Sequence, residues 1–346
     1  MQFYTVDPLS DSRWGDLVAS HPRASVFHQV GWLRALATTY GYRVTALTST
    51  PPAQKLADGL AFCEVKSWVT GGRLVSLPFS DHAEPLFNEH GPGYEMVEWM
   101  EKQCRSRNWK YIELRPVSEM LQSHHPLAQS ESFWLHTLDL TRPIEQLFRN
   151  LHKSCIQRRI RHAEREHLTY QKGRSKELLE EFYELLMITR RRFRLLPQPR
   201  AWFRNLIANL TPNAEIRLVR KEHTPVAAIF TLRHRGTVIY KYGCSDEKYH
   251  HLGGMPFLFW KLIEESKAEN ADEIDFGRTD LDNEGLTRFK DSLGTVRRHL
   301  NYLQYPPNIK KASPVGSKMG AVRKVFSILP DALSSRLGQL AYRHMG

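Results

Sequence analysis

The spacing of apolar residues predicts an alternation of helices and strands along the chain. Helical spacing of three and four residues is clearest over 176–193, where apolar side chains recur on one face: Leu178, Leu179, Phe182, Leu185, Leu186 and Ile188. Further helices are expected at 32–40, 97–107, 143–166, 256–269 and 286–293. Strands are expected at 60–65, 73–77, 111–114, 214–220, 226–233, 237–243, 273–276 and 300–305. This pattern predicts an α/β protein in which mixed sheets pack against helices.

The first half of this pattern recurs in the second half with near-equal spacing. In each half a glycine opens a strand that ends at a Ser-Asp pair, and a tryptophan on the next helix precedes an acidic strand residue. The matched separations are Gly72 to Asp81 (9 residues) with Gly236 to Asp246 (10), and Trp99 to Glu113 (14) with Trp260 to Asp275 (15). Such matches predict duplication of one unit made of a β-hairpin, a helix and a strand.

Three regions follow from the repeat: a first domain at 1–137, a second at 138–306 and a tail at 307–346. In the tail, basic residues alternate with apolar ones, and Pro330 divides it into two short amphipathic helices. A basic amphipathic tail can lie on an anionic membrane. The alternative is that it packs on the body of the protein itself.

Composition places the chain among globular proteins and raises the question of an anionic partner. Hydrophobic residues make up 41% and charged residues 25% of its 346 residues. No run approaches the roughly 20 apolar residues of a membrane-spanning helix, and the N-terminus lacks the apolar core of a signal peptide. We therefore expect a cytoplasmic protein. It would be peripheral at the inner face of the membrane if the tail binds there. The net charge of +12 favours a phosphate-rich cofactor, RNA or an acidic membrane surface. The basic clusters lie at 153–165, at 190–194 and beyond 308, and solvated helix faces are the alternative explanation.

Several chemistries find no support in the sequence. The four cysteines, Cys63, Cys104, Cys155 and Cys244, are far apart, and no His/Cys cluster has zinc spacing. We therefore expect mostly buried thiols, with neither a disulfide nor a structural metal. A nucleophile elbow, a Ser-His-Asp pattern and a P-loop are also missing, so a hydrolase or a kinase is not indicated.

The pair Gly253-Gly254 is a candidate phosphate site. It precedes Pro256, which suits the first position of a helix. Backbone N–H groups at a helix N-terminus bind phosphate, and glycine lets a ligand approach the backbone closely. An ordinary turn would have the same sequence, and the matching loop of the first half, 81–94, is longer and irregular. The first half is therefore expected to be structural or to shape the acceptor site.

The motifs of the second half resemble those of the Fem family. These are Tyr240-Lys-Tyr-Gly-Cys-Ser-Asp246, His251-Leu-Gly-Gly-Met255, Trp260, Asp275-Phe-Gly-Arg-Thr-Asp280, Asn283-x-Gly285-Leu286 and Phe289-Lys290-x-x-x-Gly294, and the first half agrees more weakly. The family comprises bacterial peptidoglycan-bridge aminoacyl transferases and related acetyltransferase-like proteins. The resemblance covers about residues 20–305 and is most specific over 275–294.

The resemblance implies two tandem GNAT-like domains facing each other across a cleft. It also implies acyl-CoA or aminoacyl-tRNA as co-substrate, with no tightly bound cofactor, and a cell-envelope precursor as acceptor. DNA is not an expected partner. Members that act on lipid-linked acceptors often grip tRNA with a coiled-coil arm. This chain has no long heptad insertion, which counts against tRNA, although 143–166 is basic enough to touch a nucleic acid backbone.

The expected chemistry is attack of an amine or hydroxyl on an ester or thioester carbonyl, which needs alignment and stabilisation of an oxyanion. Lys290, in the Phe289-Lys290 pair that lies at the active cleft in the family, is the candidate for the oxyanion, and an exposed helical lysine is the alternative. Arg278 could clamp a phosphate or carboxylate. Asp280 or Asp275 could act as base, and an ion pair of Asp275 with Arg278 is the preferred alternative for Asp275.

The remaining candidates are expected to bind substrate. His251 could assist proton transfer, Tyr242 could line the cleft, and Phe289 is expected to point inward as a packing anchor. Together these residues predict an acyl- or aminoacyl-transferase. The alternative function is a non-catalytic GNAT-like protein that recognises a glycan or a lipid-linked precursor.

Overall fold

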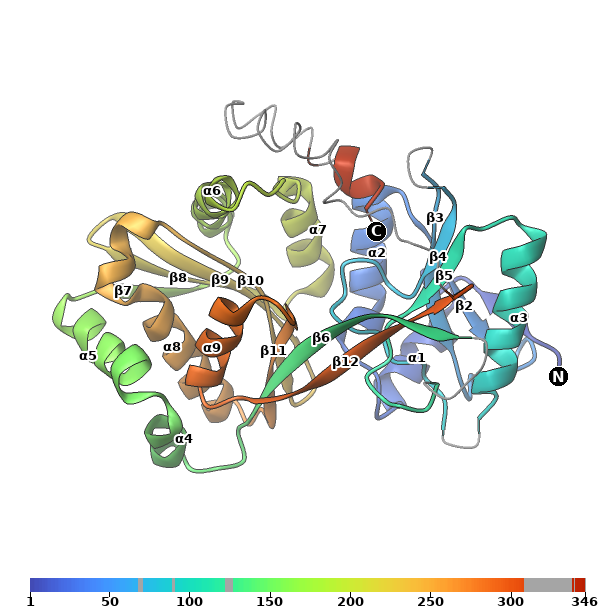
Figure 1. Ribbon diagram of the computed structural model, residues 1–346, viewed down its shortest axis with the longest axis horizontal. Helices are drawn as coiled ribbons and strands as arrows, with labels where there is room; N and C mark the ends of the chain where they lie inside the picture. The colour runs from blue at the N-terminus through green and yellow to red at the C-terminus, as the bar shows by residue number, and fades with distance from the viewer. Residues whose placement is uncertain (68–70, 89–90, 122–126, 308–337, 339, 346) are drawn as a thin grey trace. The chain divides into compact units, whose positions relative to one another are not determined.

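The computed structural model describes residues 1–67, 71–88, 91–121, 127–307, 338 and 340–345, and these divide into two compact units (Figure 1). The first unit takes its described residues from 1–132, 300–307 and the C-terminal segment, and the second consists of 133–299. Each unit is a mixed sheet with helices packed on it, which confirms the predicted fold class. The proposed domain limits 1–137, 138–306 and 307–346 stay a prediction.

The first unit is built on the strand order β1-β2-β3-β4-β5-β12. Strands β1 to β4 are antiparallel, β5 is parallel to β4, and β12 returns antiparallel to β5 with Leu303 opposite Leu114. Its elements are β1 (Tyr4–Val6), α1 (Ser12–Ser20), η1 (Val26–His28), α2 (Val30–Tyr40), β2 (Arg43–Thr48), β3 (Leu60–Val65), β4 (Arg73–Val75), α3 (Gly93–Ser106), β5 (Tyr111–Leu114) and β12 (Val296–Tyr305). One core joins α3 to the sheet through Met96, Met100, Phe62 and Ile112.

The second unit repeats this arrangement in the strand order β7-β8-β9-β10-β11-β6. Its elements are β6 (Ala128–Asp139), α4 (Ile144–Asn150), η2 (Lys153–Gln157), α5 (Arg158–Arg165), β7 (Thr169–Gly173), α6 (Lys176–Arg192), α7 (Arg200–Leu210), β8 (Ala214–Lys221), β9 (Thr224–His234), β10 (Thr237–Ser245), η3 (Glu247–Leu252), α8 (Gly254–Ala268), β11 (Glu273–Asp280) and α9 (Glu284–Ser292). Helices α4, α5 and α8 share a core with one face of this sheet, and α6 and α7 lie over its other face (Figure 1).

The same topology in both units confirms the predicted repeat. In each, an antiparallel hairpin leads through a helix to a parallel strand: β3-β4-α3-β5 in the first and β9-β10-α8-β11 in the second. The last strand is exchanged, however. The first unit is completed by residues 300–305 from the end of the second half, and the strand β6 beside β11 follows directly on the first half.

Three expectations about elements need correction. The helix expected over 143–166 is interrupted at Leu151, because the His152 side chain caps a new turn by accepting from Cys155 N–H at 3.2 Å. Strand β11 continues to Asp280 instead of ending at Phe276. Ile188, counted on the apolar face of α6, is exposed.

Most of the predicted amphipathic tail lies outside the described residues. Its described end packs on the first unit: the Tyr42 hydroxyl donates to the carbonyl of Tyr342 at 2.9 Å, and Arg73 donates to the carbonyl of His344 at 2.8 Å. The Tyr342 ring also lies 5.6 Å from that of Phe79. For these residues, packing on the protein itself is the arrangement observed.

Arg115 closes the end of the parallel pair β4–β5. Its Nε donates to Glu113 Oε1 at 2.7 Å, and its Nη1 donates to the carbonyl of Ser80 at 2.9 Å. Its backbone N–H donates to Ser76 Oγ at 2.9 Å, while Ser76 N–H donates to the carbonyl of Glu113 at 2.8 Å. The guanidinium also lies 5.0 Å from the ring centroid of Tyr302. Strands β4 and β5 are therefore linked up to their ends.

Replacing Arg115 by Met is expected to lower the free energy of unfolding by about 3–5 kcal/mol, because the buried Glu113 carboxylate loses its ion pair with Arg115. Urea unfolding of the full chain, followed by circular dichroism, measures this. The exposed Arg43 on β2 provides the control, since Arg43→Met should change stability by less than about 0.5 kcal/mol. Removing the charge of Glu113 as well, with Glu113→Gln, should recover part of the loss. Equal unfolding midpoints for Arg115→Met and wild type would contradict this account.

Candidate functional site

The neighbouring parallel strands β10 and β11 separate before they end. Their paired residues stop at Ile239 opposite Asp275, although β10 continues to Ser245 and β11 to Asp280. Backbone N–H and C=O groups that leave a strand ladder must find other partners. In the first unit, the corresponding pair Val75 and Glu113 is followed by the Ser76 and Arg115 links. The open strand end of the second unit is therefore our candidate site.

A β-bulge in β11 shapes this strand end. Phe276 and Gly277 together lie opposite the single residue His136 of β6. Gly277 has a φ of 71°, in the left-handed region that favours glycine. Asp275 is buried, and its Oδ1 accepts from Gly277 N–H at 2.7 Å. Asp275 thus stabilises the bulge, and the turn expected at Gly277 is a bulge inside a longer strand.

Lys290 reaches the same bulge from α9. Its side chain is only 3% exposed, so the alternative of a surface lysine is wrong. Its Nζ donates to the carbonyl of Gly277 at 3.0 Å and to the carbonyl of Arg278 at 3.2 Å. The ammonium therefore holds the carbonyls of Gly277 and Arg278, while Asp275 holds the N–H of Gly277.

His136 is a site residue that sequence reasoning missed. It is fully buried opposite the bulge, and its Nε2 lies 3.4 Å from Asp291 Oδ1. Burial, together with the charge of Lys290, lowers the pKa of His136 to about 4. The imidazole is therefore neutral at pH 7, and Lys290 supplies the positive charge. The sequence analysis did not predict strand β6, so it could not place His136 beside β11.

Three further candidates lie around the bulge. The Arg278 guanidinium is 4.3 Å from the ring centroid of Phe133, within range of a cation–π contact. Asp280 is exposed at the end of β11, and its carbonyl accepts from Asn283 N–H at 3.0 Å in the turn to α9. The Phe289 ring packs 5.6 Å from that of Phe259, and its role in binding substrate stays a prediction.

A second group of candidates lies where η3 meets α8. Gly253 has a φ of 79°, and a Cβ there would come within 2.5 Å of the carbonyl oxygen of Arg159. Gly254 begins α8, whose first N–H groups lack partners within the helix. His251 is exposed, and its carbonyl accepts from Arg159 Nη1 at 2.8 Å. Gly253 thus allows α5 to pack closely against the N-terminus of α8.

The hydroxyl of Tyr242 contacts helix α7 and neither of the two groups described above. Its side chain is buried, and its hydroxyl accepts from Trp202 Nε1 at 2.8 Å. Its ring lies 5.0 Å from that of Phe203, which like Trp202 belongs to α7. This part of Tyr242 stabilises the packing of α7 on the sheet, and its role in binding substrate stays a prediction.

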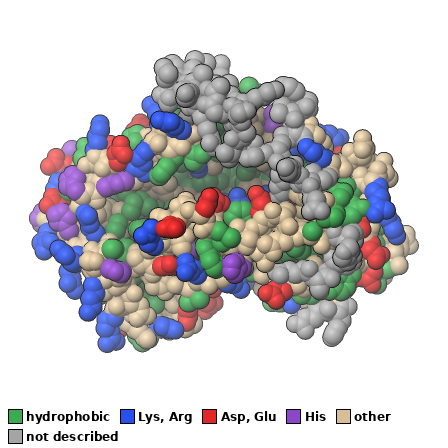
Figure 2. Space-filling view, in the orientation of Figure 1, with side chains coloured by type: hydrophobic (Ala, Val, Ile, Leu, Met, Phe, Trp, Pro, Cys, Tyr) green, Lys and Arg blue, Asp and Glu red, His purple; other side chains and the backbone are tan. Residues whose placement is uncertain are grey.

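A basic pocket of about 570 Å³ lies beside the N-terminus of α8. Figure 2 shows Lys, Arg and His side chains gathered over the region that α5 occupies in Figure 1. The pocket is lined by Ser154, Arg158, Arg159, Arg161, His162, Arg165 and His251. Its lining contains cations, histidines and a hydroxyl but no carboxylate, so it suits an anion.

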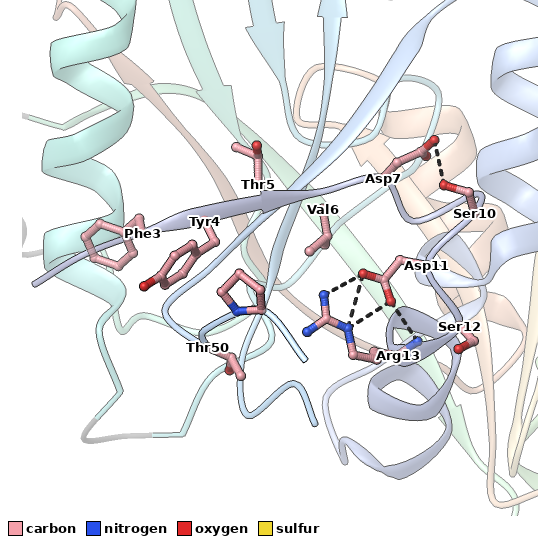
Figure 3. A pocket seen from close by; sticks show the side chains of 11 residues that line it. Phe3, Tyr4, Thr5, Val6, Asp7, Ser10, Asp11, Ser12, Arg13 and Thr50 are labelled. Carbon is pink, nitrogen blue, oxygen red and sulfur yellow. Dashed lines mark hydrogen bonds and ion pairs between the residues drawn. The ribbon is translucent and has the colours of Figure 1, made fainter. Parts of the chain in front are cut away.

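A pocket of about 820 Å³ in the first unit has a different character (Figure 3). Asp11 caps α1 by accepting from Arg13 N–H at 3.1 Å, and it pairs with the Arg13 guanidinium at 2.6 Å. The hydrogen bond from that guanidinium lowers the pKa of Asp11. Asp7 accepts from the Ser10 hydroxyl at 3.0 Å. Both carboxylates hold the start of α1, and we assign this pocket no chemistry.

Within the described residues, no three His, Cys, Asp or Glu side chains are placed to hold a metal ion. None of the helices described is both long and apolar enough to cross a membrane. Cys63, Cys104 and Cys244 are buried and Cys155 is exposed, as expected for mostly buried thiols.

Comparison with known proteins agrees with this fold. Residues 151–291, which span α5, the open strand end and Lys290, match the family model of the acetyltransferase (GNAT) domain. No curated protein matches the sequence significantly.

Three solved structures show the similarity of fold. FemX has a TM-score of 0.68 and 14% identity, covering 88% of this chain and 97% of FemX. A tandem GNAT protein from the clavulanic acid biosynthesis pathway has a TM-score of 0.55 and 12% identity, covering 88% of this chain and 97% of that protein. The C-terminal domain of a protein assigned as a lysylphosphatidylglycerol synthetase, from Agrobacterium fabrum, has a TM-score of 0.57 and 12% identity, covering 85% of this chain and 90% of that domain.

The predicted resemblance is thus confirmed at the level of fold: residues 151–291 match the model of the acetyltransferase (GNAT) domain, and the fold of the chain is similar to those of FemX and of a tandem GNAT protein.

Proposed function

We propose that this protein transfers an acyl or aminoacyl group from an activated donor to an amine or hydroxyl of a cell-envelope precursor. The observation that carries the proposal is the separation of β10 and β11 beside the N-terminus of α8, inside the acetyltransferase domain. Strand ends and helix N-termini offer backbone groups that can hold an extended, phosphate-bearing donor.

The donor would be an acyl-CoA or an aminoacyl-tRNA. Both carry phosphates and a reactive carbonyl, joined as a thioester in one and as an ester in the other. The Gly254 amide at the start of α8 would hold a phosphate, whereas the predicted Gly253 amide already donates to the carbonyl of His250 at 3.2 Å. The donor would extend from there toward the bulge of β11. The first unit has no comparable opening among its described residues, because Arg115 links β4 to β5. We therefore propose that each chain has one transfer site and that this site lies in the second unit.

In the proposed reaction, the acceptor nitrogen or oxygen attacks the donor carbonyl. The new C–N or C–O bond forms first and gives a tetrahedral intermediate. When the intermediate collapses, the bond to the thiol sulfur or the ribose oxygen breaks, and the acceptor proton passes to that leaving group. Asp280 and His251, both exposed, are the candidates to relay this proton. Arg278 would bind the donor's phosphate or carboxylate.

Lys290 would stabilise the oxyanion indirectly, by holding the backbone of the bulge and by its positive charge. Its ammonium holds the carbonyls of Gly277 and Arg278, so it determines the path of β11 where the donor carbonyl would lie. A buried positive charge there also favours the negative charge of the tetrahedral intermediate. Asp275 supports the same bulge by its hydrogen bond with Gly277, and Phe289 and Tyr242 would form apolar walls.

The proposed acceptor rests on similarity. The motifs over 275–294 resemble the Fem family, and the fold is similar to FemX and to the domain assigned to a lysylphosphatidylglycerol synthetase. These likenesses favour a cell-envelope precursor, either a peptidoglycan or polysaccharide unit or a lipid-linked one. Association of the tail with an anionic membrane would bring the site to a lipid-linked acceptor, and this also remains a proposal.

The direct test incubates the full chain with acyl-CoAs or aminoacyl-tRNAs and with soluble or lipid-linked murein precursors. Mass spectrometry of the acceptor should show the mass of one transferred group. Precursor binding without transfer from any of these donors would instead favour a non-catalytic binding protein.

Replacing Lys290 by Met is expected to lower kcat about a hundredfold or more, with the donor KM changed little, because the loss affects the transition state. The structure also predicts a loss of about 1–3 kcal/mol in stability, since two backbone carbonyls lose a buried donor. Turnover is therefore measured well below the melting temperature of the variant. Lys261→Met, on the partly exposed face of α8, is the matched control. Wild-type kcat in Lys290→Met would remove Lys290 from the mechanism.

Arg278→Ala is expected to raise the donor KM about tenfold or more, because a charged contact to the donor is lost. Arg297→Ala is the matched control: its guanidinium lies 4.7 Å from the Trp134 ring centroid, as that of Arg278 lies 4.3 Å from Phe133. Steady-state kinetics with varied donor concentration measures both. If the two variants raise the donor KM equally, Arg278 has no special part in donor binding.

A further inference from the structure

The last turn of α9 contacts two strands at the bulge of β11. Lys290 donates to the carbonyls of Gly277 and Arg278 on β11. The next residue, Asp291, reaches β6, where its Oδ1 lies 3.4 Å from His136 Nε2. His136 is the β6 residue that lies opposite the bulge. The position of this turn, and with it the position of the Lys290 ammonium, therefore depends on both strands.

The imidazole of His136 is poorly satisfied for a buried polar group. Its side chain is 0% exposed, and neither ring nitrogen has a hydrogen-bond partner among the residues that the structure describes. The 3.4 Å contact with Asp291 is longer than the roughly 2.7–3.2 Å of an ordinary N–H···O bond. The hydroxyls of Thr279 on β11 and Thr287 on α9 are likewise buried without a partner in the described part of the chain. Such groups cost stability.

Stability alone does not explain a histidine at position 136. Exchanging a buried, unsatisfied polar group for an apolar group of similar shape is neutral or stabilising. Leucine suits this strand, since Leu135 and Leu138 are buried on β6. Proteins keep unfavourable polar groups mainly where function needs them. The choice of side chain at position 136 therefore points to a role in function.

A neutral imidazole suits both charged neighbours of His136. Burial and the charge of Lys290 lower the pKa of His136, so the ring carries no charge that would repel the Lys290 ammonium. In the tautomer with the proton on Nε2, the ring directs an N–H group toward Asp291 Oδ1. Arg297 Nη1 lies 3.5 Å from the other carboxylate oxygen, Oδ2. Each oxygen of Asp291 thus faces one donor, and one of the two donors comes from the strand opposite the bulge.

We propose that His136 is a positioning residue of the transfer reaction: through Asp291 it fixes the turn of α9 that carries Lys290 against the bulge. This inference rests on the proposed function. Because the ring is fully buried, it cannot touch the donor or the acceptor, and it acts only through other side chains. A displacement of about 1 Å in a group that stabilises the transition state can cost about a hundredfold in rate.

The test replaces His136 in the full chain by Leu, which is apolar and similar in volume. The value of kcat should fall about tenfold or more while the donor KM changes less than about twofold, because the effect acts through Lys290. The melting temperature should stay the same or rise, because an unsatisfied polar group is removed. His136→Gln, whose amide N–H extends toward the position of Nε2, should retain most of the wild-type kcat.

His234→Leu is the matched control. His234 is a buried histidine of β9 in the same sheet, and burial lowers its pKa as it does that of His136. It lies outside the candidate site, so its replacement should leave kcat unchanged. An equal fall of kcat in His234→Leu and His136→Leu would assign the effect to the sheet as a whole and overturn the proposal.

A double variant tests the route through Lys290. If His136 acts by positioning Lys290, His136→Leu/Lys290→Met should have the kcat of Lys290→Met alone. Losses that multiply in the double variant would overturn the proposal. So would wild-type kcat in His136→Leu, or a clear fall in its melting temperature, since stability would then explain the histidine. Absence of transfer by the wild-type chain in the product assay would refute the proposed function and this role with it, whereas the other outcomes leave the proposed function intact.

Discussion

A parallel strand pair must keep its backbone groups hydrogen-bonded up to its end or supply other partners for them. The two units of this protein meet this constraint in opposite ways. In the first, Ser76 and Arg115 link β4 to β5, and the guanidinium extends the network to the carbonyl of Ser80. In the second, β10 and β11 separate, and Asp275 and Lys290 hold the bulge that follows. The chemistry that we propose depends on this second arrangement.

The repeat makes the comparison direct, because the equivalent residues can be matched. Glu113 and Asp275 are both buried acids on the strand that follows the helix, and each accepts a hydrogen bond from two residues further on. In the first unit the donor is the Arg115 side chain, and in the second it is the backbone of Gly277. Both units thus have a buried acidic residue at this position, and the residue two positions later, Arg115 or Gly277, determines whether the strand end is closed or bulged.

Sequence patterns predicted the elements with strong periodicity or clear turns. Strands β3 and β5 were predicted with their observed limits, and α6 to within a residue. The weakly patterned β6, which supplies His136, was missed, and so were β7 and α7. Lys290 and Arg278 were predicted as site residues from their motif, and their roles stay a proposal. Their contacts could not be predicted, because the burial of Lys290 depends on a bulge opposite a strand that comes about 150 residues earlier in the chain.

The exchanged last strand has a consequence for synthesis on the ribosome. Strand β5 ends at Leu114, but its neighbour in the first sheet, residues 300–305, is made only after the whole second half. At about 5–20 residues per second, that interval lasts roughly 10–40 s. During it, the edge of β5 is exposed to any chain that can pair with it. The nascent first unit therefore needs either a temporary cover on that edge or the protection of a chaperone until the end of the chain arrives.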